Sequence, residues 1–528
     1  FRPWVRRNLI AIGFSWKTHP FRGVVKRAQK MFQNWHTPMI DTVQNHRIGV
    51  IDVGSNSVRL VVFDGAIRSP SYFYNEKVMA GLGLDLTKSG RLHPEGKKRA
   101  LRALRRFHKI ANRMDLTSLA AVATEAVRAA SDGPEFCQQV LDETGIELVL
   151  ITGDQEASLS AQGVLLGWPK ASGLVCDIGG ASMELAAINS GKITKTRTSK
   201  LGPMSVLGRF DVSKQQDNYI DKELANLTDG FALGAQTLFL VGGSWRALAQ
   251  IHMRQTGYPL RVIHDYVVDP KDLMPTLGFA MNCTPEQMRT EANVSSARAA
   301  LVPTAAKVLM HFLDGAQVGE IAFSSYGLRA GLLYENMDDD IRDTDPMIAA
   351  ARALEAAHAR FAGFGDILFE WLQPIFGAFD KSMNRLIHAA CLLHDVHWRA
   401  HPDYRSEMCF DAATLANLGG IDHGGRVFLA WALMHRYKVG QVSPSYSAVR
   451  GMLSSDDVRL AQTVGQAIRL GAMMSSADPE HMGRLILTSK ALNLELDADS
   501  KDMFGEVVMK RLQTVADSLD RVATVSYV

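Results

Sequence analysis

The sequence predicts an α/β fold in two similar halves, followed by an all-α domain and a small α+β domain. Three observations lead to this prediction. The pattern Asp-x-Gly-x-x-Ser-x-x-Leu occurs twice between apolar runs, at 52–60 and at 177–185. Strand-like apolar segments alternate with helical segments up to about residue 331. From about residue 346, Ala, Leu, Phe and His recur at helical spacing, and two strand-like runs precede a last helix.

The repeated motif predicts a strand, a tight polar turn and a second strand. One copy alone would be interpreted as an ordinary hairpin, but its recurrence at the same offsets favours a shared role. Glycine-rich turns expose backbone N–H groups that can cradle phosphate, and an Asp at the end of the entering strand is a hard ligand for a divalent cation. The candidate phosphate-binding residues are Gly54, Ser55, Asn56 and Ser57 in one loop and Gly179, Gly180, Ala181 and Ser182 in the other, with Asp52 and Asp177 as candidate metal ligands.

A third phosphate contact is predicted after the apolar run 237–241. This run ends in Gly242, Gly243 and Ser244 and leads into a helical segment. A strand that feeds glycines into the start of a helix places free N–H groups and the positive end of the helix dipole where a phosphate can bind. Alone the Gly-Gly-Ser run is weak; together with the two hairpin loops it completes a phosphate-gripping cleft.

Composition bounds the class of protein. At 528 residues the chain is too long for one core. A net charge of +3 does not indicate a polycation, so we expect no specific nucleic-acid binding. The five cysteines are scattered without CxxC spacing, which favours a reducing cytoplasm over a disulfide framework or a zinc site. No apolar run is long enough to span a membrane.

Residues 1–46 form a basic N-terminal extension with one acid, Asp41. Its apolar stretch is short for a signal peptide. We expect a loosely attached segment; the alternative is an anchor to anionic lipid or polyphosphate, which would place the protein peripherally at the membrane surface.

A predicted helix from Lys97 to Met114 is basic and contains no acid. Positions 98, 102, 105 and 109 share one face at helical spacing. A solvated face and a site for an anionic ligand are about equally supported. A second basic segment contains Lys192, Lys195, Arg197 and Lys200.

Carboxylates and one arginine near strand ends are candidates for chemistry. Glu156 follows the strand-like run 148–152, in the first turn of a helix, where it could take a proton from water attacking a phosphate. Glu125 is the rival base. Arg128 follows another strand end, and its planar fork suits a transferring phosphoryl group, although a structural ion pair is as plausible. Glu184 lies across the second turn from Asp177 and can share a Mg²⁺ with it.

Several catalytic motifs are absent: the sequence contains no G-x-x-x-x-G-K-[ST], H-E-x-x-H or G-x-S-x-G. The cleft therefore has carboxylates but no candidate covalent nucleophile. This combination favours direct attack by water.

These motifs together resemble the exopolyphosphatase and guanosine pentaphosphate phosphohydrolase family of the actin, sugar-kinase and heat-shock ATPase superfamily. The resemblance rests on 52–57, 124–128, 153–157, 177–184 and 242–244. It implies Glu156 as the catalytic carboxylate, Asp177 and Glu184 as metal-associated acids, and Arg128 and Asn56 as phosphate contacts. It also implies two RNase H-like subdomains flanking a cleft, at 47–170 (with a helix near 324–337) and 171–323, then an HD-like helical domain at 345–455 and a small C-terminal domain at 463–528.

The sequence departs from the family pattern at two places. In the second loop, Ala181 replaces a glycine and Met183 replaces a threonine, which could weaken contacts near Glu184. In the helical domain, His394 and Asp395 resemble the HD signature, but the other histidines have no diagnostic spacing. We expect this domain to be catalytically silent.

The resemblance implies a Mg²⁺-dependent (or Mn²⁺-dependent) exopolyphosphatase that releases terminal phosphate from inorganic polyphosphate. Hydrolysis of guanosine pentaphosphate is the close alternative, because it would use the same loops. A kinase or ATPase and a non-catalytic polyphosphate or alarmone sensor are more distant ones. A homodimer is expected from the family alone.

Overall fold

The computed structural model describes residues 47–528, except 66, 211, 235, 293, 295, 438–443, 476–481 and 499. The predictions made for the basic segment 1–46 lie outside the described residues.

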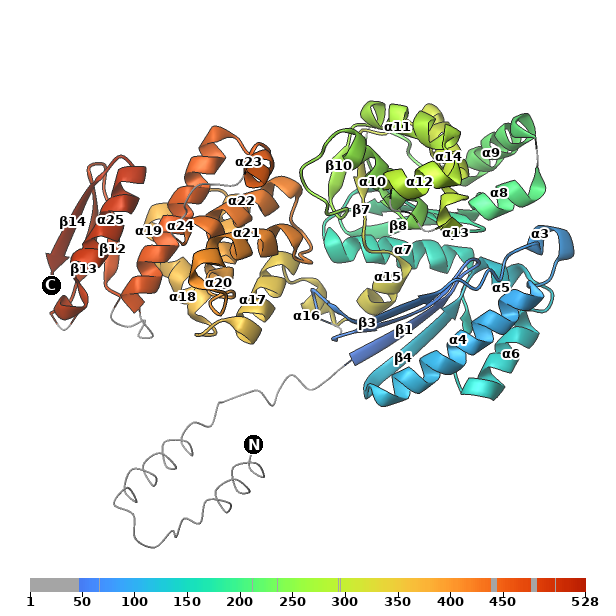
Figure 1. Ribbon diagram of the computed structural model, residues 1–528, viewed down its shortest axis with the longest axis horizontal. Helices are drawn as coiled ribbons and strands as arrows, with labels where there is room; N and C mark the ends of the chain where they lie inside the picture. Colours follow the sequence, from blue (N-terminus) through green and yellow to red (C-terminus); the bar gives the residue numbers. More distant parts are fainter. Residues whose placement is uncertain are drawn as a thin grey trace, which may run out of the picture. The chain divides into compact units, whose positions relative to one another are not determined.

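The first half is a five-stranded sheet with strand order β3-β2-β1-β4-β5 (Figure 1). β1 and β2 are antiparallel, whereas β1, β4 and β5 are parallel. Its strands are β1 (Arg47–Val53), β2 (Val58–Phe63), β3 (Tyr72–Val78), β4 (Leu116–Ala123) and β5 (Val149–Leu150). Its helices are α3 (Leu86–Ser89), α4 (Pro94–Arg113), α5 (Glu125–Ala129), α6 (Gly133–Thr144) and α7 (Gly153–Gly167).

Both faces of this sheet are buried because apolar residues occupy both alternating sets of positions. Val58, Leu60 and Val62 of β2 pack with residues of α4 and α6. Val61 and Phe63 of the same strand pack on the opposite side, with α7 and α15 (Leu328–Glu335). Successive side chains of a strand point to opposite faces, so a continuous apolar run such as β2 predicts a sheet covered on both sides.

The second half is a six-stranded sheet with strand order β10-β11-β9-β6-β7-β8. Its strands are β6 (Gly173–Ile178), β7 (Met183–Asn189), β8 (Lys192–Ser199), β9 (Thr237–Val241), β10 (Tyr266–Val268) and β11 (Glu320–Phe323). Its helices are α8 (Pro203–Arg209), α9 (Ser213–Thr228), α10 (Gly243–Gln255), α11 (Pro270–Asn282), α12 (Pro285–Ala292), α13 (Ser296–Ala299) and α14 (Val302–Gly315). α10, α11 and α14 cover one face, and α7 covers the other.

The helices α7 and α15 therefore lie between the two sheets (Figure 1). They approach to backbone contact. A Cβ on Gly331 of α15 would lie 1.7 Å from the carbonyl oxygen of Leu159, and a Cβ on Gly163 of α7 would lie 2.5 Å from that of Gly327. Only glycine permits so close a crossing.

The described residues between 339 and 475 are mainly helical and share one core with the C-terminal segment. Its helices are α16 (Asp339–Arg342), α17 (Pro346–His358), α18 (Phe364–Trp371), α19 (Gln373–Phe376), α20 (Lys381–Leu393), η1 (Pro402–Tyr404), α21 (Arg405–Leu415), α22 (His423–His435), α23 (Pro444–Arg450) and α24 (Ser455–Ser475). The single helix α24 spans residues 455–463, the predicted boundary between the helical domain and the C-terminal domain. None of the helices in the described residues combines the length and apolarity of a membrane span.

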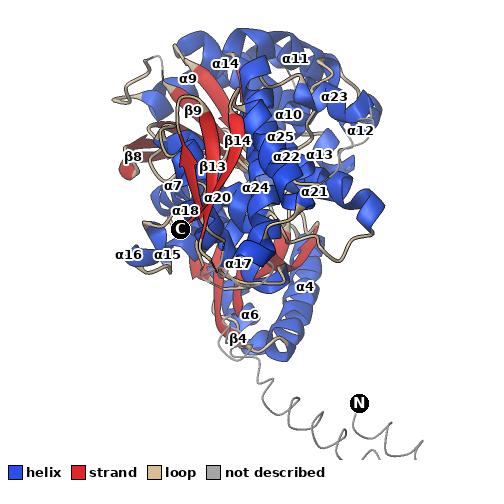
Figure 2. Cartoon of the chain, turned by 90° about the vertical axis from the view of Figure 1, so that its left-hand side faces the viewer, coloured by secondary structure: helices blue, strands red, loops and turns tan. Residues whose placement is uncertain are grey.

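The C-terminal segment is a three-stranded sheet of order β12-β13-β14 with α25 beside it (Figure 2). Its elements are β12 (Arg484–Leu487), β13 (Ala491–Leu496), η3 (Lys501–Met503), α25 (Glu506–Ser518) and β14 (Val522–Tyr527). The prediction of two strands and a last helix was incomplete, because β14 follows α25 and pairs in parallel with β13. The exposed residues of β14 weaken the apolar pattern from which strands are predicted.

The close crossing of α7 and α15 leads to a stability prediction. Gly331→Ala should lower the free energy of unfolding by about 3 kcal/mol, because the new methyl group meets backbone rather than a flexible side chain. Gly278→Ala in α11 is the matched control: nothing lies within 4 Å of its added Cβ, so it should raise stability by about 0.5–1 kcal/mol. Urea unfolding of both variants measures the difference. Equal stability of the two variants would contradict the crossing.

Candidate active site

The predicted phosphate loops meet around one cavity of about 190 Å³. The loop between β1 and β2 and the loop between β6 and β7 are closed by equivalent hydrogen bonds. Gly54 N donates to Ser57 O and Gly179 N donates to Ser182 O, each at 3.0 Å. The loops also face each other closely, since a Cβ on Gly180 would lie 3.4 Å from the Cβ of Ser55. A ligand in the cavity would therefore be held from both halves.

The third loop joins β9 to α10. Gly242 has a φ of +119°, and a Cβ there would lie 2.7 Å from the carbonyl oxygen of Ile178. Glycine is thus required both by the backbone conformation and by the contact with β6. Gly243 and Ser244 begin α10 and line the cavity, so the N-terminus of this helix is available to an anion.

Most of the predicted site residues share this cavity. Those that line it are Asp52, Gly54, Ser55, Asn56, Ser57, Glu156, Asp177, Gly179, Gly180, Ser182, Gly242, Gly243 and Ser244. Arg128, Ala181 and Glu184 are not among the lining residues.

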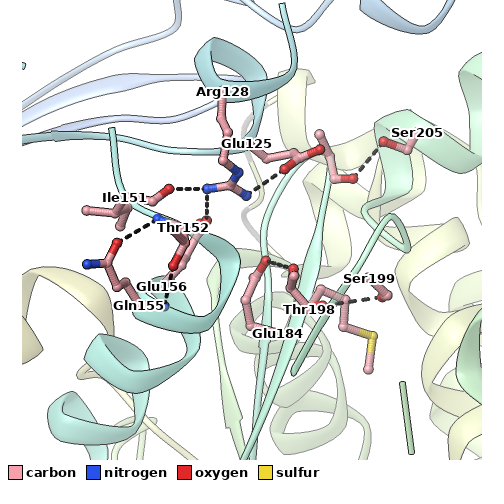
Figure 3. Close-up of polar contacts among 12 residues, drawn as sticks. Glu125, Arg128, Ile151, Thr152, Gln155, Glu156, Glu184, Thr198, Ser199 and Ser205 are labelled. Atoms are coloured by element: carbon pink, nitrogen blue, oxygen red, sulfur yellow. Dashed lines mark hydrogen bonds and ion pairs between the residues drawn. The ribbon is translucent and has the colours of Figure 1, made fainter. Parts of the chain in front are cut away.

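Glu156 lies in the first turn of α7 (Figure 3). A capping box fixes this turn: Gln155 N donates to Thr152 Oγ1 at 3.2 Å, and Thr152 N donates to Gln155 Oε1 at 2.8 Å. The start of α7 packs closely against β8: a Cβ on Gly153 would lie only 2.2 Å from Thr198 Cγ2. The side chain of Glu156 is buried, and its Oε2 atom has no hydrogen-bond partner. A buried carboxylate oxygen without a hydrogen bond is unusual and is a candidate for a functional role.

Arg128 lies beside Glu156 rather than on the cavity wall (Figure 3). It donates to Glu125 Oε2 at 2.5 Å and to the carbonyl oxygen of Ile151. Its Nη1 is 3.5 Å from Glu156 Oε2. In this arrangement its guanidinium group neutralises two carboxylates.

Strand alternation explains why the other carboxylates gather at the same layer. Asp177 and Glu184 are directly opposite each other on β6 and β7 and face α7, where Ser160 donates to Asp177 Oδ2. Thr198 donates to Glu184 Oε1 at 3.0 Å. Asp52 faces the same layer from β1, and Arg329 of α15 donates to its Oδ2 at 2.5 Å.

Four cationic side chains at the cavity were missed from the sequence. They are Arg59, Lys77, Arg246 and Arg329. Arg246 and Arg329 lie in the first turns of α10 and α15, each after a buried strand. The position after a strand end, which singled out Glu156, could have indicated both.

Burial raises the pKa of Glu156 to about 8; Arg128 opposes this shift, and Asp177 and Asp52 add to it. Burial also raises the pKa of Asp177, against a hydrogen bond from Ser160 and the charge of Arg246. The pKa of Glu184 is raised well above its usual value by burial and then by the charges of Glu156 and Asp177. Burial and mutual repulsion therefore oppose full ionisation of the three carboxyl groups, and a cationic ligand would favour it.

The two departures in the second loop have little effect on the cavity. Ala181 has a negative φ, so its backbone conformation does not require glycine. Met183 is completely buried and packs in the core beneath α10. As the neighbour of Glu184 on a strand, it points to the opposite face of the sheet. The predicted weakening near Glu184 therefore has no support in the position of the Met183 side chain.

The acids at the cavity suit a hard divalent cation. Among the described residues no group of three or more His, Cys, Asp or Glu could hold a metal. Mg²⁺, however, is usually held by one or two carboxylates together with waters and substrate phosphates. Asp52 and Asp177 each use Oδ2 in a hydrogen bond, whereas Glu156 Oε2 has no hydrogen-bond partner and only the longer ion-pair contact with Arg128. The donor set is compatible with such a site.

The predicted HD pair takes part in structural contacts. Arg360 donates from Nε to Asp395 Oδ2 at 2.7 Å and from Nη2 to Oδ1 at 2.6 Å. His394 Nδ1 lies 2.7 Å from the carbonyl oxygen of Cys391, and burial lowers the pKa of His394 to about 4. The guanidinium group of Arg360 thus binds both oxygens of Asp395, the carboxylate that a metal ion would need as a ligand.

The fold places a cavity lined by the predicted phosphate loops between two RNase H-like halves, the arrangement of the actin-like superfamily. Residues 61–340 match the Ppx/GppA phosphatase family, and residues 347–525 match the family described as "Exopolyphosphatase, C-terminal". The chain belongs to the Ppx/GppA phosphatase family, and both the predicted resemblance and the predicted fold class are confirmed.

Individual relatives are distant. The chain is 26% identical to exopolyphosphatase 1 of Mycobacterium tuberculosis over 319 residues, which are 56% of this chain and 90% of that protein. It is 28% identical over 202 residues to a bifunctional 3-dehydroquinate synthase/phosphatase of Fusobacterium nucleatum, covering 36% of this chain and only 30% of that protein. A crystal structure of an exopolyphosphatase from Cytophaga hutchinsonii aligns with a TM-score of 0.52 and 26% identity, covering 55% of this chain and 99% of that one.

The raised pKa of Glu156 predicts how stability changes with pH. Since the folded pKa of about 8 lies above the ordinary value of 4.5, protonation favours the folded state below pH 4.5. This stabilisation is lost as pH rises from 4.5 to about 8. Glu156→Gln should therefore reduce the fall in unfolding free energy between pH 5 and pH 8, as measured by urea unfolding.

Asp154→Asn is the matched control, because Asp154 is an exposed carboxylate in the same helical turn. It should leave the pH dependence unchanged. If Glu156→Gln and Asp154→Asn give the same pH dependence as the wild type, the assigned protonation of Glu156 is wrong.

Proposed function

We propose that this chain is an exopolyphosphatase, which hydrolyses the terminal phosphoanhydride bond of inorganic polyphosphate. The observation that carries the proposal is Glu156: a buried carboxylate with one oxygen that has no hydrogen-bond partner and a pKa of about 8, at a cavity lined by the three proposed phosphate loops. The family match and the exopolyphosphatase relatives support the same substrate class.

In the proposed reaction a water oxygen attacks the terminal phosphorus while the bridging P–O bond breaks. The water proton passes to Glu156 Oε2, and the shortened chain leaves with the bridging oxygen. Backbone N–H groups of the three loops and the cationic groups of Arg246 and Arg329 stabilise the charge on the phosphate oxygens. Arg128 positions Glu156 through their ion pair; a direct phosphate contact would require it to leave its present partners.

A bound Mg²⁺ or Mn²⁺ would neutralise charge on the substrate phosphates. Asp52 and Asp177 are the residues that we propose to hold it, with Glu184 behind Asp177. We also propose the homodimer that the resemblance implies, which light scattering of the purified chain tests.

Glu156→Gln should lower kcat for long-chain polyphosphate by about 10²–10⁴-fold, because the general base is lost. Binding of the substrate should persist, since the loops are intact. Phosphate release and direct binding measure the two quantities. Glu125→Gln is the matched comparison for the rival base: if it loses turnover while Glu156→Gln retains it, the base is Glu125.

A parallel assay of phosphate release from long-chain polyphosphate, guanosine pentaphosphate and ATP tests the substrate class. We expect the fastest release from polyphosphate, with a rising limb of kcat/KM as pH approaches about 8, because Glu156 must ionise before it accepts a proton. Preference for guanosine pentaphosphate would replace the proposal with its close alternative. Binding without release from any substrate would indicate a sensor.

A further inference from the structure

The solvent-facing side of α4 is strongly basic. Its apolar residues pack against the first sheet, while the opposite face exposes Arg102, Arg105, Arg106, Lys109 and Arg113. These positions follow helical spacing from residue 102 to residue 113, a rise of about 16 Å along the axis. α4 covers the outer side of the first sheet (Figure 1).

Acids from neighbouring elements neutralise only part of this charge. The sequence showed no acid within 97–114, yet Glu143 of α6 accepts from Arg105 Nε at 2.7 Å, and Glu76 of β3 accepts from Arg106 Nε at 2.8 Å. The absence of acids along the helix therefore overstated the free charge. Arg102, Lys109 and Arg113 have no acidic partner in the part of the chain that the structure describes.

The five basic side chains and Ile110 line a groove of about 380 Å³. The ion pairs with Glu143 and Glu76 restrain Arg105 and Arg106, so part of the groove wall is preorganised. A row of cations along a groove matches a linear polyanion better than a single phosphate, because several charges then act on one ligand.

The groove is separate from the catalytic cavity but is linked to it through the start of α4. A Cβ on Gly96 in the first turn would lie 2.7 Å from the carbonyl oxygen of Gly81, and Gly81 N donates to Asn56 O in the first phosphate loop at 3.0 Å. The groove residues lie on later turns, and none of them lines the cavity.

The other basic segment is less available. Lys195 donates to the carbonyl oxygen of Asp229 at 3.0 Å, and Arg197 lies 3.3 Å from the Asp229 carboxylate and donates to the carbonyl oxygen of Asn226 at 2.5 Å. The end of α9 therefore already engages these cations. Lys192 and Lys200 of this segment also have no acidic partner among the described residues, whereas the cations of α4 line a common groove.

We propose that the α4 groove is a second anion site, which binds an internal stretch of a polyphosphate chain while the terminal phosphate occupies the catalytic cavity. The identity of the polymer rests on the proposed function; the anion site itself rests on the groove. Only a chain long enough to reach both places gains affinity from it, so the groove would make binding depend on chain length.

The test compares binding of long-chain polyphosphate and tripolyphosphate at several salt concentrations, with EDTA present to prevent turnover. The triple variant Arg102→Ala, Lys109→Ala, Arg113→Ala removes the unpaired cations. Long-chain affinity should fall by about tenfold or more, and the slope of log Kd against log salt should decrease by about two. Tripolyphosphate affinity should be unchanged.

The control triple variant Lys214→Ala, Lys222→Ala, Lys271→Ala removes the same charge from exposed positions on α9 and α11 and should behave as the wild type. An equal loss in both triple variants, an equal loss for short and long chains, or no loss would overturn the proposal. Displacement of long-chain polyphosphate by duplex DNA or phosphatidylserine vesicles at equal phosphate concentration would overturn it in favour of another polyanion.

Binding and turnover separate this proposal from the proposed function. If the wild type releases no phosphate but loses long-chain binding on removal of the groove cations, the exopolyphosphatase proposal fails and the anion site stands. If the wild type hydrolyses polyphosphate and the triple variant binds long chains normally, the exopolyphosphatase proposal stands and the anion-site proposal fails.

Discussion

The backbone contact between α7 and α15 is the constraint on which the site depends. Gly163 and Gly331 let the two helices cross without side chains between them, so one thin helical layer can serve both sheets. That layer fixes where the carboxylates meet: β1, β6 and β7 each turn an acid toward it, and α7 supplies Glu156 from its own first turn. The cavity is thus a product of strand alternation on two sheets that share a helical layer.

Burying several carboxyl groups close together is electrostatically unfavourable when no cationic ligand is bound. Glu156, Asp177 and Glu184 are buried close together, and each has a raised pKa. The compensating guanidinium groups, Arg128 and Arg329, come from separate elements and pair with Glu156 and Asp52. A cluster that is incompletely neutralised by the protein is suited to a charged substrate and its counterions.

The sequence predicted features that are local, and it failed where tertiary contact decides. The loops at 54–57 and 179–182 were predicted because turn chemistry is encoded in adjacent residues, and Glu156 because it follows a strand end. Arg329 also follows a strand end, but its pairing with Asp52 could not be predicted because the two residues are 277 positions apart. The concern over Met183 arose from proximity in sequence to Glu184, but the pleat of β7 separates their side chains. The acidic partners of α4, Glu143 and Glu76, likewise could not be predicted from the sequence of the helix itself.

The repeated order of elements has a consequence for the chemistry. In each half, the helix that follows the last parallel strand beside the cavity enters the central layer: α7 after β5 and α15 after β11. The first turn of α7 carries Glu156, whereas the first turn of α15 carries Arg329. The two helix starts thus carry opposite charges, with Glu156 four residues past its N-cap Thr152 and Arg329 two residues past its N-cap Gly327. Two halves of similar construction therefore present a carboxylate and a guanidinium group to the same cavity, which makes the cavity electrostatically asymmetric.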